Sequence, residues 1–308
     1  MLVSILIPMR NAEPYIEKTL NSILKGSYEI IEIIVIDDGS IDDSLNIVKA
    51  LNDSRVKVFS GACMGIASAF NRALDLSNGE LVMRCDADDL YVDDRVSWQV
   101  AWLKRNSGYD GICCNFGVID SSGDVINDVL NSGLTSECIT DELKGGVTRT
   151  HFCTYCVKTS VLKRINGCRE FFVTAEDIDL QLRIGEVANI WYESRVGYLY
   201  RLHATSATHT QQNSQRIFYE DTAKIFQKQR QLDGVDRLEC GDPPIPPKHS
   251  KEKPNTANRH IVDMLNGKAW SLYRRGNKVQ AVRPLFKALI LNPLEIKTWK
   301  SILMIILK

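Results

Sequence analysis

Short apolar segments rich in β-branched residues alternate with helical patterns through the first hundred residues of the chain. Each apolar run is followed by a turn, and then by a segment whose apolar residues recur at the spacing of a helix. This unit occurs four times, with the apolar runs VSILIP, IEIIVID, VKVF and LVMRCD followed by the helical segments EPYIEKTLNSIL, IDDSLNIVKAL, GIASAFNRALDL and DRVSWQVAWLKR. The alternation predicts an α/β domain in which helices flank a Rossmann-like, mostly parallel sheet.

Polar residues close these apolar runs. In open parallel sheets, ligands bind beyond the carboxyl ends of the strands. The polar residues that we expect to converge on this edge are Pro8, Arg10, Asp37, Asp38, Asp86 and Asp88.

The pattern changes after residue 110. Mixed strand and helix signals in residues 110–205 complete the same domain, and residues 207–232 are typical of a helix. A segment with five prolines follows and predicts a linker. The predicted organisation is an α/β domain at 1–233, a Pro-rich linker at 234–255 and a helical hairpin at 256–308. The hairpin resembles one tetratricopeptide repeat in the order of Trp270, Tyr273, Gly276, Ala281, Phe286, Ala288 and Pro293.

Composition narrows the function only slightly. The chain has 308 residues, of which 44% are hydrophobic and 25% charged, and this is ordinary for a globular protein. Lys plus Arg and Asp plus Glu both number 38, so charge gives no reason to expect nucleic acid as a partner. The nine cysteines form no repeating framework, which favours reduced thiols and a cytoplasmic location. We assign no chemistry to Cys153 and Cys156, although they form a CxxC pair.

Two apolar termini bear on membranes. The first run is too short for the core of a signal peptide and is interrupted at Arg10, so it predicts a strand. No apolar window reaches the length of about 18 residues that a membrane span requires. The apolar tail WKSILMIILK could lie on the inner face of a membrane but could not cross it.

The stretch LVMRCDADDLYVDD contains five aspartates in nine positions. Asp93 and Asp94 are explained as charges at the start of a helix. Asp86 and Asp88 end an apolar run, and their spacing places both carboxylates on one side of an extended segment. Their repulsion requires a cation, which is either a basic side chain or a metal.

The chain as far as about residue 210 resembles an inverting glycosyltransferase of family 2, with the nucleotide-diphospho-sugar fold called GT-A. Five segments carry the resemblance in the family's order: VSILIPMRNAEPYIEKTLNSIL, IDDGS, GIASAFNRALDLSNGELVMRCDADDLYVDDR, AEDIDLQLR and YRLHATSAT. Any one of them is weak evidence, whereas the ordered set is specific.

The resemblance implies a donor site. The aspartate at the end of the second strand would accept hydrogen bonds from a uracil ring, with Asp37 the first choice and Asp38 the second. Pro8 and Arg10 would line the same base pocket. Many relatives carry an arginine where Phe70 stands, and Arg84, which lies close by in sequence, is the arginine that would contact the nucleotide here.

A DxD motif would serve the ribose and the diphosphate. Asp86 would contact the ribose or a metal-bound water, and Asp88 would ligate Mn²⁺ or Mg²⁺ directly. His203, after the last strand, would also bind the metal. Asp89 is read as a helix-opening charge.

The acceptor side is implied by the later segments. An inverting transfer needs one base to remove the proton of the attacking hydroxyl, and Asp177 matches that position. Glu176 would bind the acceptor or orient the base, and Arg183 would form an ion pair. His151 would lie near the acceptor, and Arg201 would face the diphosphate or the acceptor.

The resemblance therefore implies a metal-dependent transferase acting on a nucleotide-sugar donor, expected to be UDP-linked, and on a glycan or lipid-linked acceptor in surface polysaccharide assembly. Two other interpretations remain open. A sugar-phosphate nucleotidyltransferase would need a Gly-rich phosphate loop after the first strand, where the chain has PMRNAEPY. A non-catalytic nucleotide-sugar or partner-binding module would be expected to lack the carboxylate set.

Overall fold

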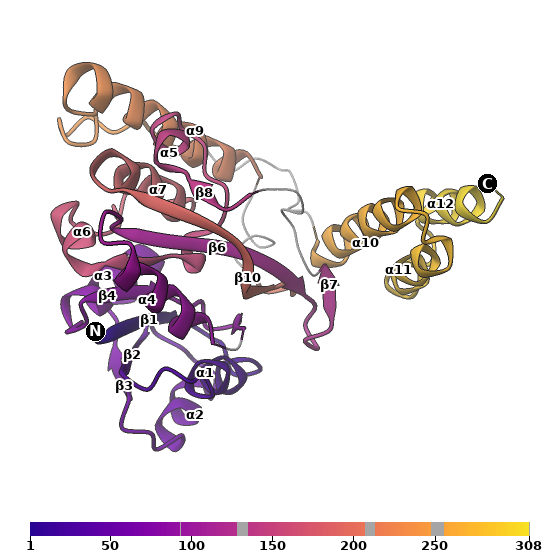
Figure 1. Ribbon diagram of the computed structural model, residues 1–308, viewed down its shortest axis with the longest axis horizontal. Helices are drawn as coiled ribbons and strands as arrows, with labels where there is room; N and C mark the ends of the chain where they lie inside the picture. Colours follow the sequence, from indigo (N-terminus) through magenta and orange to yellow (C-terminus); the bar gives the residue numbers. More distant parts are fainter. Residues whose placement is uncertain (93, 128–134, 207–212, 248–255, 308) are drawn as a thin grey trace. The chain divides into compact units, whose positions relative to one another are not determined.

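The computed structural model describes residues 1–92, 94–127, 135–206, 213–247 and 256–307. The chain forms two compact units. The first comprises residues 1–116, 131–199 and 216–247, and the second comprises residues 117–130, 200–215 and 248–308. Strands β6 and β10 run from the first unit into the second (Figure 1).

The first unit is built on the predicted parallel strands. These are β1 (Val3–Met9), β2 (Ile31–Asp37), β3 (Val56–Ser60) and β4 (Leu81–Arg84), in the order β3-β2-β1-β4. The register opposes Met9 to Asp37 and Leu6 to Arg84. The carboxyl ends of β1, β2 and β4 therefore meet at one edge, as the sequence predicts.

The sheet continues with antiparallel pairs beyond β4. The full order is β3-β2-β1-β4-β9-β6-β10-β5, and β8 pairs with β10. These strands are β5 (Leu90–Tyr91), β6 (Gly111–Ile119), β8 (Glu137–Cys138), β9 (Cys156–Lys158) and β10 (Ile190–Arg201). The predicted α/β class is confirmed, with a mixed sheet in place of a mostly parallel one.

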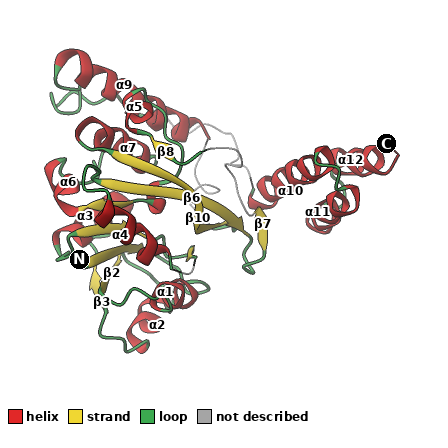
Figure 2. Cartoon of the chain, in the orientation of Figure 1, coloured by secondary structure: helices red, strands yellow, loops and turns green. Residues whose placement is uncertain are grey.

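Helices flank this sheet (Figure 2). They are α1 (Ile16–Leu24), α2 (Ser44–Ala50), α3 (Ile66–Asp75), α4 (Arg95–Arg105), α5 (Thr140–Lys144), α6 (Thr159–Arg164), α7 (Glu176–Val187) and α9 (Asn213–Asp233), with the short 3₁₀ helix η1 (Phe152–Thr154). On one face Leu6 joins a core with Phe70 of α3 and Ile184 of α7. Ile5 and Ile7 point to the other face and are also fully buried, so both faces are covered.

Residues 234–247 belong to the first unit. Asp236 is fully buried, where it accepts hydrogen bonds from Arg169 (2.6 Å) and Arg230. A Pro-rich linker is predicted from residue 234, whereas these ion pairs fix the start of that segment to the domain. Whether the predicted segments 1–233, 234–255 and 256–308 fold independently stays a prediction.

The second unit contains strand β7 (Val125–Asn127) and the helices α10 (Ala257–Arg274), α11 (Lys278–Leu291) and α12 (Ile296–Leu307). Gly276 has φ 82°, a left-handed conformation that suits glycine in the turn between α10 and α11. The helices pack through a core formed by Ala269, Ala281, Leu285, Leu289, Ile302 and Ile305.

All nine cysteines are free thiols. Burial raises the pKa of Cys153 and Cys156, which agrees with their assignment to packing. Among the described helices, none has the length and apolar character needed to cross a bilayer.

Candidate active site

The end of β2 presents Asp37 and Asp38, both more than nine-tenths buried. Oδ1 of Asp37 accepts a hydrogen bond from the backbone N–H of Ser40 (3.1 Å) and so closes the following turn. Oδ2 of Asp38 accepts from the N–H of Gly65 (2.8 Å), at the start of α3. The other oxygen of Asp38 has no hydrogen-bond partner within the described part of the chain.

This second oxygen of Asp38 lies against Gly61, where an added Cβ would stand 2.6 Å away. The first-choice residue, Asp37, is therefore committed to a turn, and the second choice holds an unsatisfied acceptor. Of the other two residues predicted for the base pocket, Pro8 is buried within β1 and Arg10 is exposed after it. Phe70 is fully buried and packs edge-on against Phe152 at 5.7 Å, so it belongs to the core.

Arg84 joins two of the predicted carboxylates. Its Nε donates to Oδ1 of Asp86 at 2.8 Å, and its Nη1 donates to Oε1 of Glu176 at 3.1 Å. The side chains of Arg84 and Glu176 are 3% and 8% exposed, so this ion pair is sheltered from water, whereas the side chain of Asp86 is 28% exposed. Burial opposes the charge of Arg84, but the two carboxylates outweigh it and raise the pKa of Arg84. Arg84 is thus the basic side chain that offsets the charge of Asp86.

Glu176 and Asp177 open α7 but differ in exposure. Ala175, just before them, adopts a left-handed conformation with φ 57°, which turns the chain sharply into the helix. Glu176 is 6% exposed and its pKa is raised by burial, with Arg84 opposing that shift. Asp177 is half-buried. The helix start favours negative charge at both positions.

His151 precedes η1 and packs edge-on against Phe116, with ring centroids 4.6 Å apart. Burial lowers the pKa of His151, and the negative charges of Asp177 and Asp86 oppose that shift. The first unit therefore brings together five of the predicted residues: Arg84, Asp86, His151, Glu176 and Asp177.

The remaining aspartates of the motif behave differently from one another. Asp88 is half-buried. Asp89 is fully buried and accepts a hydrogen bond of 2.6 Å from the hydroxyl of Tyr198. Its interpretation as a helix-opening charge is wrong, because α4 begins only at Arg95 and a strand hydroxyl holds the carboxylate.

His203 and Arg201 lie in the second unit. Nδ1 of His203 is 2.9 Å from Oγ1 of Thr205. Arg201 is buried and donates to the backbone oxygen of Asp120 at 3.1 Å. The predicted metal role of His203 and the predicted contact of Arg201 with the diphosphate or acceptor stay predictions.

Comparison with known proteins identifies the family. Residues 4–165, more than half of the chain, match the sequence model of glycosyl transferase family 2. This chain belongs to glycosyl transferase family 2.

Individual relatives are distant from this family 2 protein. An uncharacterized glycosyltransferase of Rickettsia prowazekii is 28% identical over 232 residues, which cover 74% of this chain and 72% of that protein. Chondroitin synthase of Escherichia coli is 28% identical over 209 residues, which cover 67% of this chain but only 30% of the synthase. The chain thus spans less than a third of that larger relative.

Solved structures confirm the fold. The S. aureus TarS fragment 1–349 in complex with UDP-GlcNAc superimposes with a TM-score of 0.60 and 19% identity, over 99% of this chain and 90% of that one. The GT-A fold predicted for this family 2 glycosyltransferase is therefore confirmed.

The sequence did not indicate two residues that support the site, Tyr198 and Arg95. The hydroxyl of Tyr198 accepts a hydrogen bond from the N–H of Asp86 (3.2 Å) while it donates to Asp89. Arg95 is almost fully buried, lies 4.2 Å from the ring centroid of Tyr91 and donates to the backbone oxygen of Cys153 at 2.6 Å. The position of Arg95 directly after the acidic loop is the one sequence feature that could have indicated its role.

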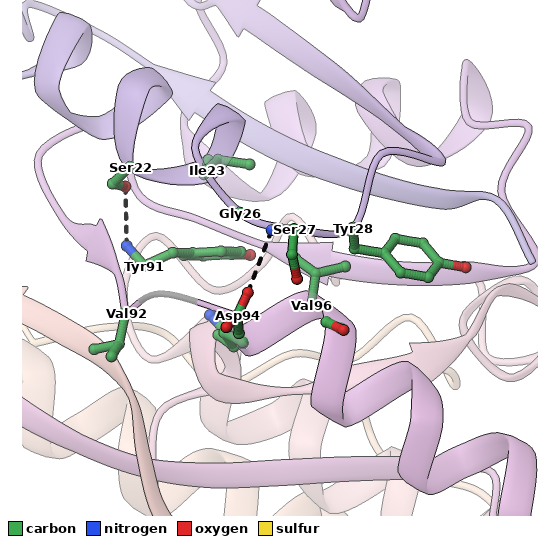
Figure 3. A pocket seen from close by; sticks show the side chains of 11 residues that line it. Ser22, Ile23, Gly26, Ser27, Tyr28, Tyr91, Val92, Asp94 and Val96 are labelled. Carbon is green, nitrogen blue, oxygen red and sulfur yellow. Dashed lines mark hydrogen bonds between the residues drawn. The ribbon is translucent and has the colours of Figure 1, made fainter.

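A small pocket elsewhere in the first unit lies between α1, β5 and α4 (Figure 3). Two hydrogen bonds cross it, from the N–H of Tyr91 to Ser22 and from the N–H of Ser27 to Asp94. None of the predicted site residues lines it. This pocket is therefore separate from the carboxylate cluster.

The donor set of the motif suits a hard divalent ion. The described residues contain no group of three His, Cys, Asp or Glu side chains arranged to hold a metal. Mg²⁺ and similar ions often take only one or two carboxylates from the protein and the rest of their oxygens from phosphates and water. The two carboxylates of Asp86 and Asp88 fit that mode.

Proposed function

We propose that this protein is an inverting, metal-dependent glycosyltransferase that moves a sugar from a UDP-linked donor to a glycan or lipid-linked acceptor in surface polysaccharide assembly. The observation that carries the proposal is the cluster in which Arg84 ties Asp86 to Glu176 while the neighbouring Asp177 stays half-buried. Family membership supports sugar transfer, and the TarS complex with UDP-GlcNAc supports a UDP-sugar. Chondroitin synthase supports a polysaccharide product.

The donor would bind across the ends of β1, β2 and β4. The uracil base would lie near Asp38, which has one buried carboxylate oxygen without a hydrogen-bond partner in the described residues. A buried hydrogen-bond acceptor without a partner costs free energy, and a hydrogen bond donated by the uracil ring to Asp38 would recover it. This assignment reverses the order of preference between Asp37 and Asp38.

Asp86 and Asp88 would hold the metal at the diphosphate. A bound Mn²⁺ or Mg²⁺ ion would offset the negative charge that develops on the leaving diphosphate. Arg84 already neutralises part of the charge of Asp86 and orients its carboxylate by a hydrogen bond. Asp88 is left as the principal protein ligand.

Asp177 would act as the general base. Inversion requires the acceptor hydroxyl to attack from the side opposite the diphosphate, while a base removes its proton. Glu176 is poorly suited to this step, because its carboxylate is buried and bonded to Arg84. Asp177 combines partial exposure with a position at the start of α7, next to His151.

The donor proposal is tested by screening UDP-sugars for hydrolysis and by calorimetry of UDP binding with and without Mn²⁺. We expect Asp88→Asn to lose most of the Mn²⁺-assisted affinity while the protein stays folded. Asp75→Asn, at an exposed aspartate that ends α3, is the matched control. Equal UDP affinity after complete chelation would contradict the metal role, and no UDP binding under any condition would contradict the donor class.

A further inference from the structure

Helix α12 carries its apolar side chains on the outside. The side chains that face its neighbours are Thr298, Ser301, Ile302 and Ile305, so half of the inner face is polar. The outer face, by contrast, carries six apolar side chains that are exposed by 43–80%, namely Ile296, Trp299, Leu303, Met304, Ile306 and Leu307, together with the exposed Lys297 and Lys300. A helix that only covered a core would show the opposite distribution.

Specific hydrogen bonds fix this orientation. Nδ2 of Asn266 in α10 donates to Oγ1 of Thr298 at 2.9 Å, and Nε1 of Trp270 donates to Oγ of Ser301 at 3.1 Å. Rotating α12 to bury its outer face would break both bonds and leave buried polar groups unsatisfied. The apolar face is therefore held outward by the packing of the second unit, in which α10, α11 and α12 lie side by side (Figure 1).

The C-terminal segment that contains α12, residues 256–308, has a large excess of basic residues. Residues 256–308 contain ten Lys and Arg but only two acidic residues, Asp263 and Glu295, although the whole chain is balanced at 38 to 38. Lys297 and Lys300 lie on α12 itself. The rest of the chain consequently carries a net negative charge, so the positive charge is concentrated in this C-terminal segment. On α12 itself Lys297 is paired with Asp263 at 3.1 Å, and Lys300 is exposed on the same side as the apolar residues.

We infer that the outer face of α12 binds the surface of an anionic lipid bilayer. An apolar helix face combined with nearby Lys and Arg is the pattern that binds at the boundary between headgroups and acyl chains. The helix is about 18 Å long at 1.5 Å per residue, too short to cross a hydrocarbon core of about 30 Å. Trp299 is half-exposed and suits the interfacial depth at which tryptophan is enriched.

A second copy of the chain is a poorer occupant. Two such units would bring together two segments that each carry an excess of Lys and Arg, and like charges oppose association. A bilayer rich in anionic lipid complements both the apolar face and the basic side chains. The inference does not depend on the proposed sugar transfer.

The test is flotation of the full-length protein with vesicles of phosphatidylcholine alone or of phosphatidylcholine and phosphatidylglycerol in equal parts. We expect binding to the anionic vesicles, weakened by salt, and little binding to the neutral ones. The double variant Leu303→Ser/Ile306→Ser should reduce the partition coefficient by a factor on the order of 10². Lys300→Glu should reduce it by about tenfold at low salt.

The matched control is Ile30→Ser/Ile41→Ser, which removes two isoleucines of the first unit that are at least as exposed as Leu303 and should leave partitioning unchanged. Trp299 gives a second readout, because its fluorescence should shift to the blue on anionic vesicles and Trp299→Phe should abolish that component. Absence of binding to anionic vesicles by the folded wild type would overturn the inference. Equal vesicle binding by Leu303→Ser/Ile306→Ser and by the control Ile30→Ser/Ile41→Ser would also overturn it. So would a wild type that dimerises with rising concentration but binds no vesicles, if Leu303→Ser/Ile306→Ser abolishes the dimer.

Discussion

At the scale of single residues, the buried guanidinium of Arg84 distinguishes the two carboxylates that open α7, because it pairs with Glu176. It pairs with Glu176 and Asp86, which lie 92 and two positions away in sequence. Removing one partner from a buried ion pair is strongly destabilising, since the other charge is left uncompensated. Glu176 is thereby a structural counterion for Arg84, and Asp177 is left as the candidate base.

His151 should make stability depend on pH. Its pKa is lowered in the folded protein, chiefly by burial, from an ordinary value of 6.5. The unfolded chain therefore binds a proton more readily, so the stabilisation is present above pH 6.5 and is lost as the pH falls through the lowered pKa. We expect the free energy of unfolding to fall by up to about 1.4 kcal/mol per pH unit in that window through this group.

Urea denaturation of the wild type and His151→Gln between pH 7.5 and pH 5 measures this contribution. The variant should lose less stability on acidification than the wild type, because glutamine does not titrate. Parallel curves for the two proteins would show that His151 is not the titrating group.

At the scale of elements, the hydroxyl of Tyr198 in β10 organises the loop that carries the acidic motif. It contacts both the N–H of Asp86 and the carboxylate of Asp89. We expect Tyr198→Phe to lower the free energy of unfolding by about 1–3 kcal/mol, because Asp89 would remain buried without this donor. Thermal and urea unfolding measure the change.

A double-mutant cycle with Asp89→Asn is the control for this contact. The two substitutions should be coupled by about 1 kcal/mol or more, since they remove the same hydrogen bond. Strictly additive effects would mean that the contact does not stabilise the loop.

The elements also show what the sequence could and could not predict. The four strand–helix units could be predicted because the apolar residues of each recur at the spacing of a strand or a helix. Since the carboxyl ends of parallel strands meet at one edge of a sheet, Asp37, Asp38 and Asp86 could then be placed together. The antiparallel strands β9, β6 and β10 pair through contacts between distant segments, for which no local pattern exists. The links from Arg84 to Glu176 and from Tyr198 to Asp89 depend on that pairing, so the sequence alone could not supply them.

At the scale of the whole molecule, the ion pairs of Asp236 bear on where the catalytic part ends. Asp236 binds Arg169 and Arg230, and Arg169 also binds Asp179 of α7. A chain cut after residue 233 would lose Asp236 and leave the half-buried guanidinium groups of Arg169 and Arg230 with fewer partners. We expect it to be less stable by about 3–5 kcal/mol than a chain cut after residue 247.

Thermal unfolding and UDP binding of the two truncated proteins test this expectation. The longer one should bind UDP as the full chain does. Asp236→Asn in the full chain is the point-substitution control, and it should reproduce most of the loss. Equal stability of the two truncated proteins would mean that residues 234–247 contribute nothing to the domain.

The account depends most on Asp177 as the base of an inverting transfer, and Asp177→Asn tests it most directly. The change keeps the size of the side chain but removes its ability to accept a proton. With the UDP-sugar and acceptor that the wild type uses, sugar transfer should fall by a factor on the order of 10² to 10⁴ while donor affinity changes little.

Asp141→Asn, at the second position of α5 as Asp177 is at the second position of α7, is the matched control and should transfer at the wild-type rate. Glu176→Gln should lower transfer less than Asp177→Asn does. The measurement is the initial rate of transfer together with the anomeric configuration of the product by NMR. We expect an inverted product from the wild type and very little transfer by Asp177→Asn. An Asp177→Asn enzyme that makes the inverted product at close to the wild-type rate would rule out Asp177 as the base.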